Sequence, residues 1–237
     1  MLNQQLIHNI ESLPPDLQKE VEDFVDFLRQ KYLLSKTESP LKTLAAVLKH
    51  YQIHYKEADF DIIKTATISE SVQQDIVFTL KEVAYDVSEA AICENLIYPI
   101  LKEAWKRYVD IFAIWSHTAL EYDDELTGIP DYLISKRSEL GKIIFDSPLL
   151  AAVEAKKDNF SAGWAQCALE MVAMQKINND PQLSIYGIVS NGEIWEVAML
   201  NNQQFVFYNK RFVIEELDTL FNVLVSVLEA CKLQLIK

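Results

Sequence analysis

Apolar residues recur at intervals of three and four residues near the start of the chain, which is the spacing of an amphipathic helix. The residues that show it are Leu17, Val21, Phe24, Val25 and Leu28. Pro14 and Pro15 precede them, and proline is favoured in the first turn of a helix. We therefore predict a helical segment over residues 1–36. The polar residues within 33–40 indicate a linker to the rest of the chain.

The remaining pattern predicts helices first and strands later. All five glycines lie at or beyond Gly128, so turns should concentrate in the second half. Amphipathic spacing predicts helices over residues 41–55, 71–86, 88–108, 162–176 and 215–235, whereas 59–67 is ambiguous between helix and strand. Apolar, β-branched and aromatic runs predict strands over residues 109–115, 132–134, 149–156, 184–190, 193–200 and 204–208.

Two short motifs refine this picture. Ser88 is a plausible N-cap for the helix that follows it. Asn191-Gly192 stands between two predicted strands and favours a hairpin with a type I′ turn. The chain is therefore expected to be an α/β protein, with a sheet flanked by helices over residues 41–237 and a helical extension before it.

The candidate chemistry lies in Gly128-Ile129-Pro130-Asp131-Tyr132 and Ala152-Val153-Glu154-Ala155-Lys156. Side chains alternate along a strand, so Glu154 and Lys156 should share a face. An acid and an ammonium on a buried strand are costly unless they have partners or a bound cation. If the strand that follows Asp131 pairs with the strand that contains Glu154 and Lys156, the two carboxylates of Asp131 and Glu154 and the amine of Lys156 come together.

The order Pro130-Asp131, then Glu154-x-Lys156, resembles the PD-(D/E)XK signature of restriction-endonuclease-like proteins. Over residues 88–197 the chain resembles the nuclease-like domain of type I restriction subunits. The family carries an acid on the helix before the first strand, which Glu89 matches better than Glu94. It often carries a polar residue on the helix after the lysine strand, which Gln166 matches; Glu170 shares the helical face of Gln166.

The resemblance implies a restriction-endonuclease-like mixed sheet and a nuclease that hydrolyses phosphodiesters, with DNA as the expected nucleic acid. It assigns Asp131 and Glu154 as ligands of Mg²⁺ or Mn²⁺, and Lys156 as the catalytic lysine. Glu89 and Gln166 would support them. Mg²⁺ prefers oxygen ligands, and a bound metal activates water for attack on phosphorus. Basic side chains near the motif are candidate phosphate contacts, although a solvated loop explains them equally well: Lys136, Arg137, Lys142 and Lys157.

The charge balance keeps a second hypothesis open. The net charge of −13 repels nucleic acid at long range. A catalytically inactive binding or regulatory module that keeps the nuclease fold and acts through a protein partner is therefore the alternative to an enzyme.

The N-terminal stretch IESLPPDLQKEVEDFVDFLRQKY resembles the helical module of small antitoxin-like proteins of the DUF2281 type. The resemblance implies a docking or dimerisation helix in residues 1–36, as in a homo-oligomer or a partner-bound subunit. A helix that simply packs on the main domain is the alternative.

Other features of the sequence are expected to be structural. Cys93, Cys167 and Cys231 lie far apart in apolar patterns, which predicts buried free thiols. The four histidines lack metal-ligand spacing. Three aromatic residues are expected to pack in the core rather than to contact a nucleic-acid base: Trp164, Tyr186 and Trp195. No secretory signal or membrane span is evident, so we expect a cytoplasmic protein without membrane contact.

Overall fold

The computed structural model describes residues 9–15, 17–22, 24–25, 41–63 and 65–236. The chain divides into two compact units, Met1–Pro40 and Leu41–Lys237. In the first unit, residues 9–11, 15, 17–22 and 24–25 are helical, with a break at 12–14. A helix therefore resumes at Pro15, as the double proline predicts. The predicted linker over 33–40 lies outside the described residues.

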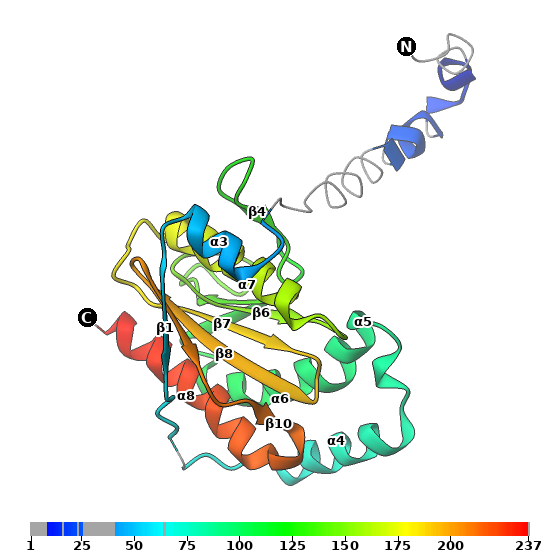
Figure 1. Cartoon of the computed structure of the whole chain (residues 1–237). Coiled ribbons are helices and arrows are strands. Elements are labelled where there is room, and N and C mark those ends of the chain that lie inside the picture. Colours follow the sequence, from blue (N-terminus) through cyan, green and yellow to red (C-terminus); the bar gives the residue numbers. More distant parts are fainter. Residues whose placement is uncertain (1–8, 16, 23, 26–40, 64, 237) are drawn as a thin grey trace. The chain divides into compact units, whose positions relative to one another are not determined.

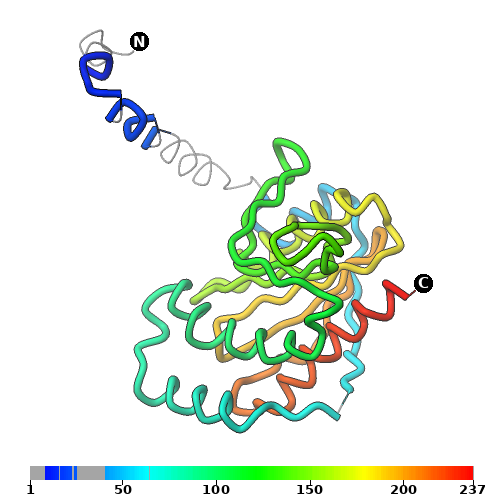
Figure 2. Tube along the Cα trace, turned by 180° about the vertical axis from the view of Figure 1, so that it is seen from behind, coloured from blue at the N-terminus to red at the C-terminus, as the bar shows by residue number. Residues whose placement is uncertain are grey.

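The second unit is built on one mixed sheet, whose strands run in the order β1-β9-β8-β7-β6-β5-β2, with β10 paired to β8. The bounds are β1 His54–Ala58, β2 Phe112–Ser116, β5 Tyr132–Lys136, β6 Leu149–Ala155, β7 Ile185–Ser190, β8 Ile194–Asn201, β9 Gln204–Tyr208 and β10 Phe212–Val213. The pairs β1–β9 and β6–β7 are parallel, and the other pairs are antiparallel. A separate hairpin of β3, Leu120–Glu121, and β4, Thr127–Gly128, projects from the body of the unit (Figure 2).

Helices cover both faces of this sheet. The bounds are α3 Leu44–His50, α4 Glu70–Glu82, α5 Glu89–Ile92, α6 Tyr98–Trp105, α7 Phe160–Asn178 and α8 Leu217–Leu235. α3 and α7 lie on one face, whereas α6 and α8 lie on the other (Figure 1). A mixed sheet flanked by helices, preceded by a helical region, confirms the predicted fold class.

Each site-bearing helix begins at a side chain that satisfies a free backbone amide. The Ser88 hydroxyl accepts a hydrogen bond from the Ala91 N–H, which confirms the predicted N-cap. The predicted helix continues through a π-helical turn at Cys93–Ile97 into α6. Asn159 caps α7 in the same way, through the Ala162 N–H. Both helices therefore have fixed starting points next to the sheet.

Two local predictions were wrong. The helix expected over 41–55 ends at His50, because Gln52 adopts a left-handed backbone with φ of 55° and the chain turns into β1. The turn at Asn191-Gly192 is not type I′, which requires positive φ at both central residues. Only Gly192 has positive φ, 89°, and the Asn191 side chain instead accepts hydrogen bonds from the N–H groups of Glu193 and Ile194. Hydrogen bonds to the Asn191 side chain, rather than a type I′ backbone turn, therefore shape this loop.

The core is continuous across the sheet and its helices. All seven residues of β6 are buried, as expected for a central strand with neighbours on both sides. Trp164, Tyr186 and Trp195 are buried, and the three cysteines are buried free thiols, as predicted. None of the described helices combines the length and apolarity needed to cross a membrane.

Asn178 joins the C-terminal end of α7 to the start of β6, because its Oδ1 accepts from the Leu149 N–H and its Nδ2 donates to the Leu149 carbonyl, both at 2.7 Å. We expect Asn178→Ala to lower the free energy of unfolding by about 1–3 kcal/mol, since both backbone groups lose their partner. Urea unfolding measures this. Lys176→Ala, on an exposed position of the same turn, should change stability by less than about 0.5 kcal/mol; equal losses in both variants would contradict the role of the amide.

Candidate functional site

The antiparallel pairing of β5 and β6 brings the first two predicted site residues together. Tyr132 pairs with Val153, so Asp131, just before β5, lies beside Glu154, near the end of β6. The Ala155 N–H donates to Asp131 Oδ2 at 2.7 Å, and the Asp131 N–H lies 3.4 Å from Glu154 Oε1. Each carboxylate is thus held by the backbone of the other segment.

Lys156 completes the predicted trio at the end of β6. Its Nζ lies 3.4 Å from Glu154 Oε2 and 3.6 Å from Glu89 Oε2. Glu89 opens α5, and both Glu89 and Glu94 are exposed, but among the described ion pairs only Glu89 contacts Lys156. The structure therefore brings Glu89, rather than Glu94, to the lysine.

The absence of a side chain at Gly163, on α7, leaves room for the side chain of Lys156. A Cβ atom at this position would lie 2.6 Å from Lys156 Cγ and 2.8 Å from Val189 Cγ1, which is closer than van der Waals contact allows. The aliphatic part of Lys156 therefore packs directly on the backbone of the helix. Only 15% of the lysine side chain is exposed.

Gln166 reaches the same cluster through Glu170 on α7. Gln166 Nε2 donates to Glu170 Oε1 at 3.2 Å, and Glu170 is 3% exposed. The Glu170 carboxyl lies within hydrogen-bonding reach of the Glu154 carboxyl. Glu170 is a site residue that the sequence indicates only through its helical spacing from Gln166.

His117 also lies at this edge, and its sequence context does not suggest it. The ring atom Nε2 of His117 is 3.4 Å from Asp131 Oδ1, and the backbone N–H of His117 donates to the Asp131 carbonyl at 3.1 Å. The residue adopts a left-handed backbone with φ of 50°, which is uncommon for histidine. The turn after β2 therefore places an imidazole beside the aspartate.

The cluster gathers acidic side chains around the Lys156 ammonium. Burial raises the pKa of Glu154 well above its usual value, and the charges of Glu170 and Asp131 raise it further. Burial also raises the pKa of Glu170, to about 7. Burial by itself lowers the pKa of Lys156, but the charges of Glu154, Glu89 and Asp131 outweigh it and raise that pKa overall. Lys156 therefore stays an ammonium at neutral pH.

Two of the predicted phosphate contacts, Arg137 and Lys136, lie away from this cluster. Arg137 Nη1 donates to the Val109 carbonyl at 2.6 Å, and Lys136 ends β5 at the far end from Asp131. Lys157 is exposed next to Lys156. Across the described residues, no three His, Cys, Asp or Glu side chains already stand in an arrangement that could hold a metal ion.

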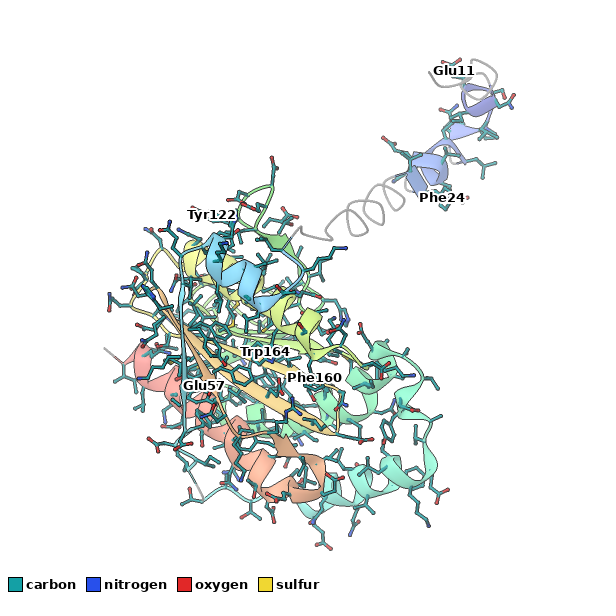
Figure 3. The ribbon with its side chains drawn as sticks, in the orientation of Figure 1. Glu11, Phe24, Glu57, Tyr122, Phe160 and Trp164 are labelled. Carbon is teal, nitrogen blue, oxygen red and sulfur yellow. The ribbon has the colours of Figure 1, made fainter. Side chains whose placement is uncertain are left out.

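A cavity of about 460 Å³ lies elsewhere on the unit, along β1 and the start of α7. Figure 3 labels three of its lining residues, Glu57, Phe160 and Trp164. At its base, Glu196 accepts hydrogen bonds from Trp164 Nε1 at 2.6 Å and from Arg211 Nε at 2.7 Å. Glu196 is thus a buried carboxylate whose two oxygens are both satisfied.

Comparison with known families bears on the N-terminal part of the chain. A family described as "Protein of unknown function (DUF2281)" matches residues 5–61. The match confirms the resemblance seen in the helical segment, and it extends through α3 and β1 of the second unit. No curated protein matches the chain.

We expect Gly163→Ala to destabilise the protein, because the added methyl group collides with Val189 and the Lys156 stem. Overpacking costs about 1–3 kcal/mol, and the better helix propensity of alanine offsets about 1 kcal/mol of it. Urea unfolding measures the difference from wild type. Ser161→Ala, on an exposed position of the same helix, is the control, and a Gly163→Ala variant as stable as this control would contradict the close packing.

Proposed function

We propose that the protein is a metal-dependent phosphodiester hydrolase of the PD-(D/E)XK type, with DNA as its expected substrate. The observation that supports this proposal is the convergence of Asp131, Glu154 and Lys156 at one end of the β5–β6 pair, although 23 residues separate the two acids along the chain. The order of these residues along the chain and the mixed sheet that carries them are those of the family.

The residues present suit a hard divalent cation. Carboxylate oxygens are the ligands that Mg²⁺ and Mn²⁺ prefer, and Asp131 and Glu154 would hold the ion. Two carboxylates forced together in a buried cluster gain from a shared cation. Because their oxygens now contact backbone amides and Lys156, binding requires changes in side-chain torsions. A bound Mg²⁺ would neutralise phosphate charge and make water a stronger nucleophile.

The chain's own residues would orient the substrate. Lys156 presents its ammonium at the edge of the cluster, where it would bind a phosphate oxygen and stabilise the charge that develops during attack. Glu89, 48% exposed, would hold that ammonium in place. Gln166 would act indirectly, through the hydrogen bond that it donates to Glu170.

A nuclease-fold module without catalysis, acting through a protein partner, is the second candidate. The net charge of −13 favours it, because the protein's field opposes a polyanion. Residues 1–36 would then provide the docking or dimerisation segment. The two candidates differ in whether the acidic cluster binds a divalent cation.

We expect Lys156→Ala to lower Mg²⁺-dependent DNA cleavage by about 100-fold or more, because the developing charge loses its nearest cation. Lys176→Ala is the control, since it removes an exposed lysine of the same charge at the C-terminal end of α7. Cleavage of a labelled duplex is the measurement, with circular dichroism to check folding. Full cleavage by folded Lys156→Ala would contradict the assigned role.

We expect the wild-type protein to bind Mn²⁺ in isothermal titration calorimetry, and Asp131→Ala to bind it at least about tenfold more weakly. The reason is the loss of one of two proposed carboxylate ligands. Asp146→Ala, which removes an exposed aspartate in the β5–β6 loop, should bind as wild type does. An absence of Mn²⁺ binding by the wild-type protein would favour the non-catalytic module.

A further inference from the structure

Aromatic rings line the cavity of about 460 Å³ that borders β1 and the start of α7. Tyr55 of β1 and Phe207 of β9 are stacked, with ring centroids 6.4 Å apart. Trp164 of α7 is inclined at 72° to Phe207, with centroids 5.2 Å apart, and Phe160 adds a fourth ring one helical turn before Trp164. The cavity thus combines aromatic surfaces from the sheet and from a helix, and its volume is typical of sites for small molecules.

A guanidinium at this cavity is held in place by a buried carboxylate. Arg211 Nε donates to Glu196 Oε1 at 2.7 Å, and 5% of the Glu196 side chain is exposed. The other oxygen of Glu196 accepts from Trp164, so the carboxylate that orients Arg211 is itself anchored. The Arg211 side chain is 66% exposed, and no described residue accepts a hydrogen bond from its Nη1 or Nη2. Such free donors suit a carboxylate, which can accept two parallel hydrogen bonds from one guanidinium.

The cavity also carries a negative charge that is not compensated within its lining. Glu57 of β1 is exposed, and its Oε1 accepts from the Tyr55 hydroxyl at 3.0 Å. Within the described part of the chain, Glu57 Oε2 has no hydrogen-bond partner. Because Arg211 and Glu196 offset each other, Glu57 leaves the lining with one net negative charge. A purely anionic ligand would meet this carboxylate, whereas an ammonium would pair with it.

We infer that this cavity is a binding site for an amino acid with an aromatic or large apolar side chain. The ligand carboxylate pairs with Arg211, its ammonium pairs with Glu57, and its side chain packs against Phe207 and Trp164. An anion or a cation alone would use only one of the two charged groups, and neither would need the aromatic surfaces. The site lies outside the acidic cluster, and the inference does not rest on the proposed function.

The first test is isothermal titration calorimetry of the full-length protein with L-phenylalanine as the probe. Two analogues each lack one of its charges: hydrocinnamate has no ammonium, and phenethylamine has no carboxylate. We expect each analogue to bind at least about tenfold more weakly than L-phenylalanine, because each loses one charge-assisted contact.

The second test matches each variant to one charge of the ligand. Glu57→Gln should weaken L-phenylalanine binding at least about tenfold but should not weaken hydrocinnamate binding. Arg211→Gln should weaken L-phenylalanine binding similarly but should not weaken phenethylamine binding. Asp59→Asn and Lys210→Gln, at exposed positions that do not line the cavity, are the controls and should bind as wild type does. Should Arg211→Gln not fold because Glu196 loses its partner, Glu57→Gln carries the comparison.

Two results would overturn the inference. The first is the absence of L-phenylalanine binding by the wild-type protein up to the solubility limit of the amino acid. The second is L-phenylalanine binding that the folded cavity variants leave unchanged, or that either analogue equals, since the charged groups assigned to the site would then not recognise the ligand.

Discussion

The hydrogen bond from the Ala155 N–H to Asp131 Oδ2 ties the start of β5 to the end of β6. Antiparallel neighbours place the beginning of one strand beside the end of the other. Tyr132 therefore pairs with Val153, and the residues that flank them on the chain, Asp131 and Glu154, become neighbours. A one-residue slip of this pairing would turn every β6 side chain to the opposite face. The register of one strand pair thus decides whether the acids meet.

The helices then determine the electrostatics of this edge. α7 packs against β6 and β7 through Gly163, whose missing side chain lets the Lys156 stem lie against the helix. Two turns further along, α7 adds Glu170, and α5 adds Glu89 from across the lysine. A single ammonium therefore serves several carboxylates in a largely buried environment. Such an arrangement is costly in a fold that needs only stability, and it supports the proposed binding chemistry.

The acidic balance of the whole chain opposes phosphate binding, whereas a cation held by the cluster would favour it. Phosphate is repelled by the protein's overall field, and the acidic cluster attracts cations. A divalent ion bound there would reverse the local sign of the charge and create a site for a phosphate oxygen. The cavity lined by Glu196 lacks this property, because Arg211 already neutralises its carboxylate.

The sequence by itself determined the fold class, the later helices and central strands, and the candidate trio, because these depend on periodicity and on local motifs such as the Ser88 cap. It did not predict β1, the β3–β4 hairpin or β10. It missed where the first helix of the second unit ends and which turn follows β7, since both depend on single backbone torsions at Gln52 and Asn191. Only the tertiary structure decided that Glu89 rather than Glu94 reaches Lys156, and that His117 and Glu170 join the cluster. Those contacts arise from helix rotation and strand register, which are set by packing between segments distant in the chain.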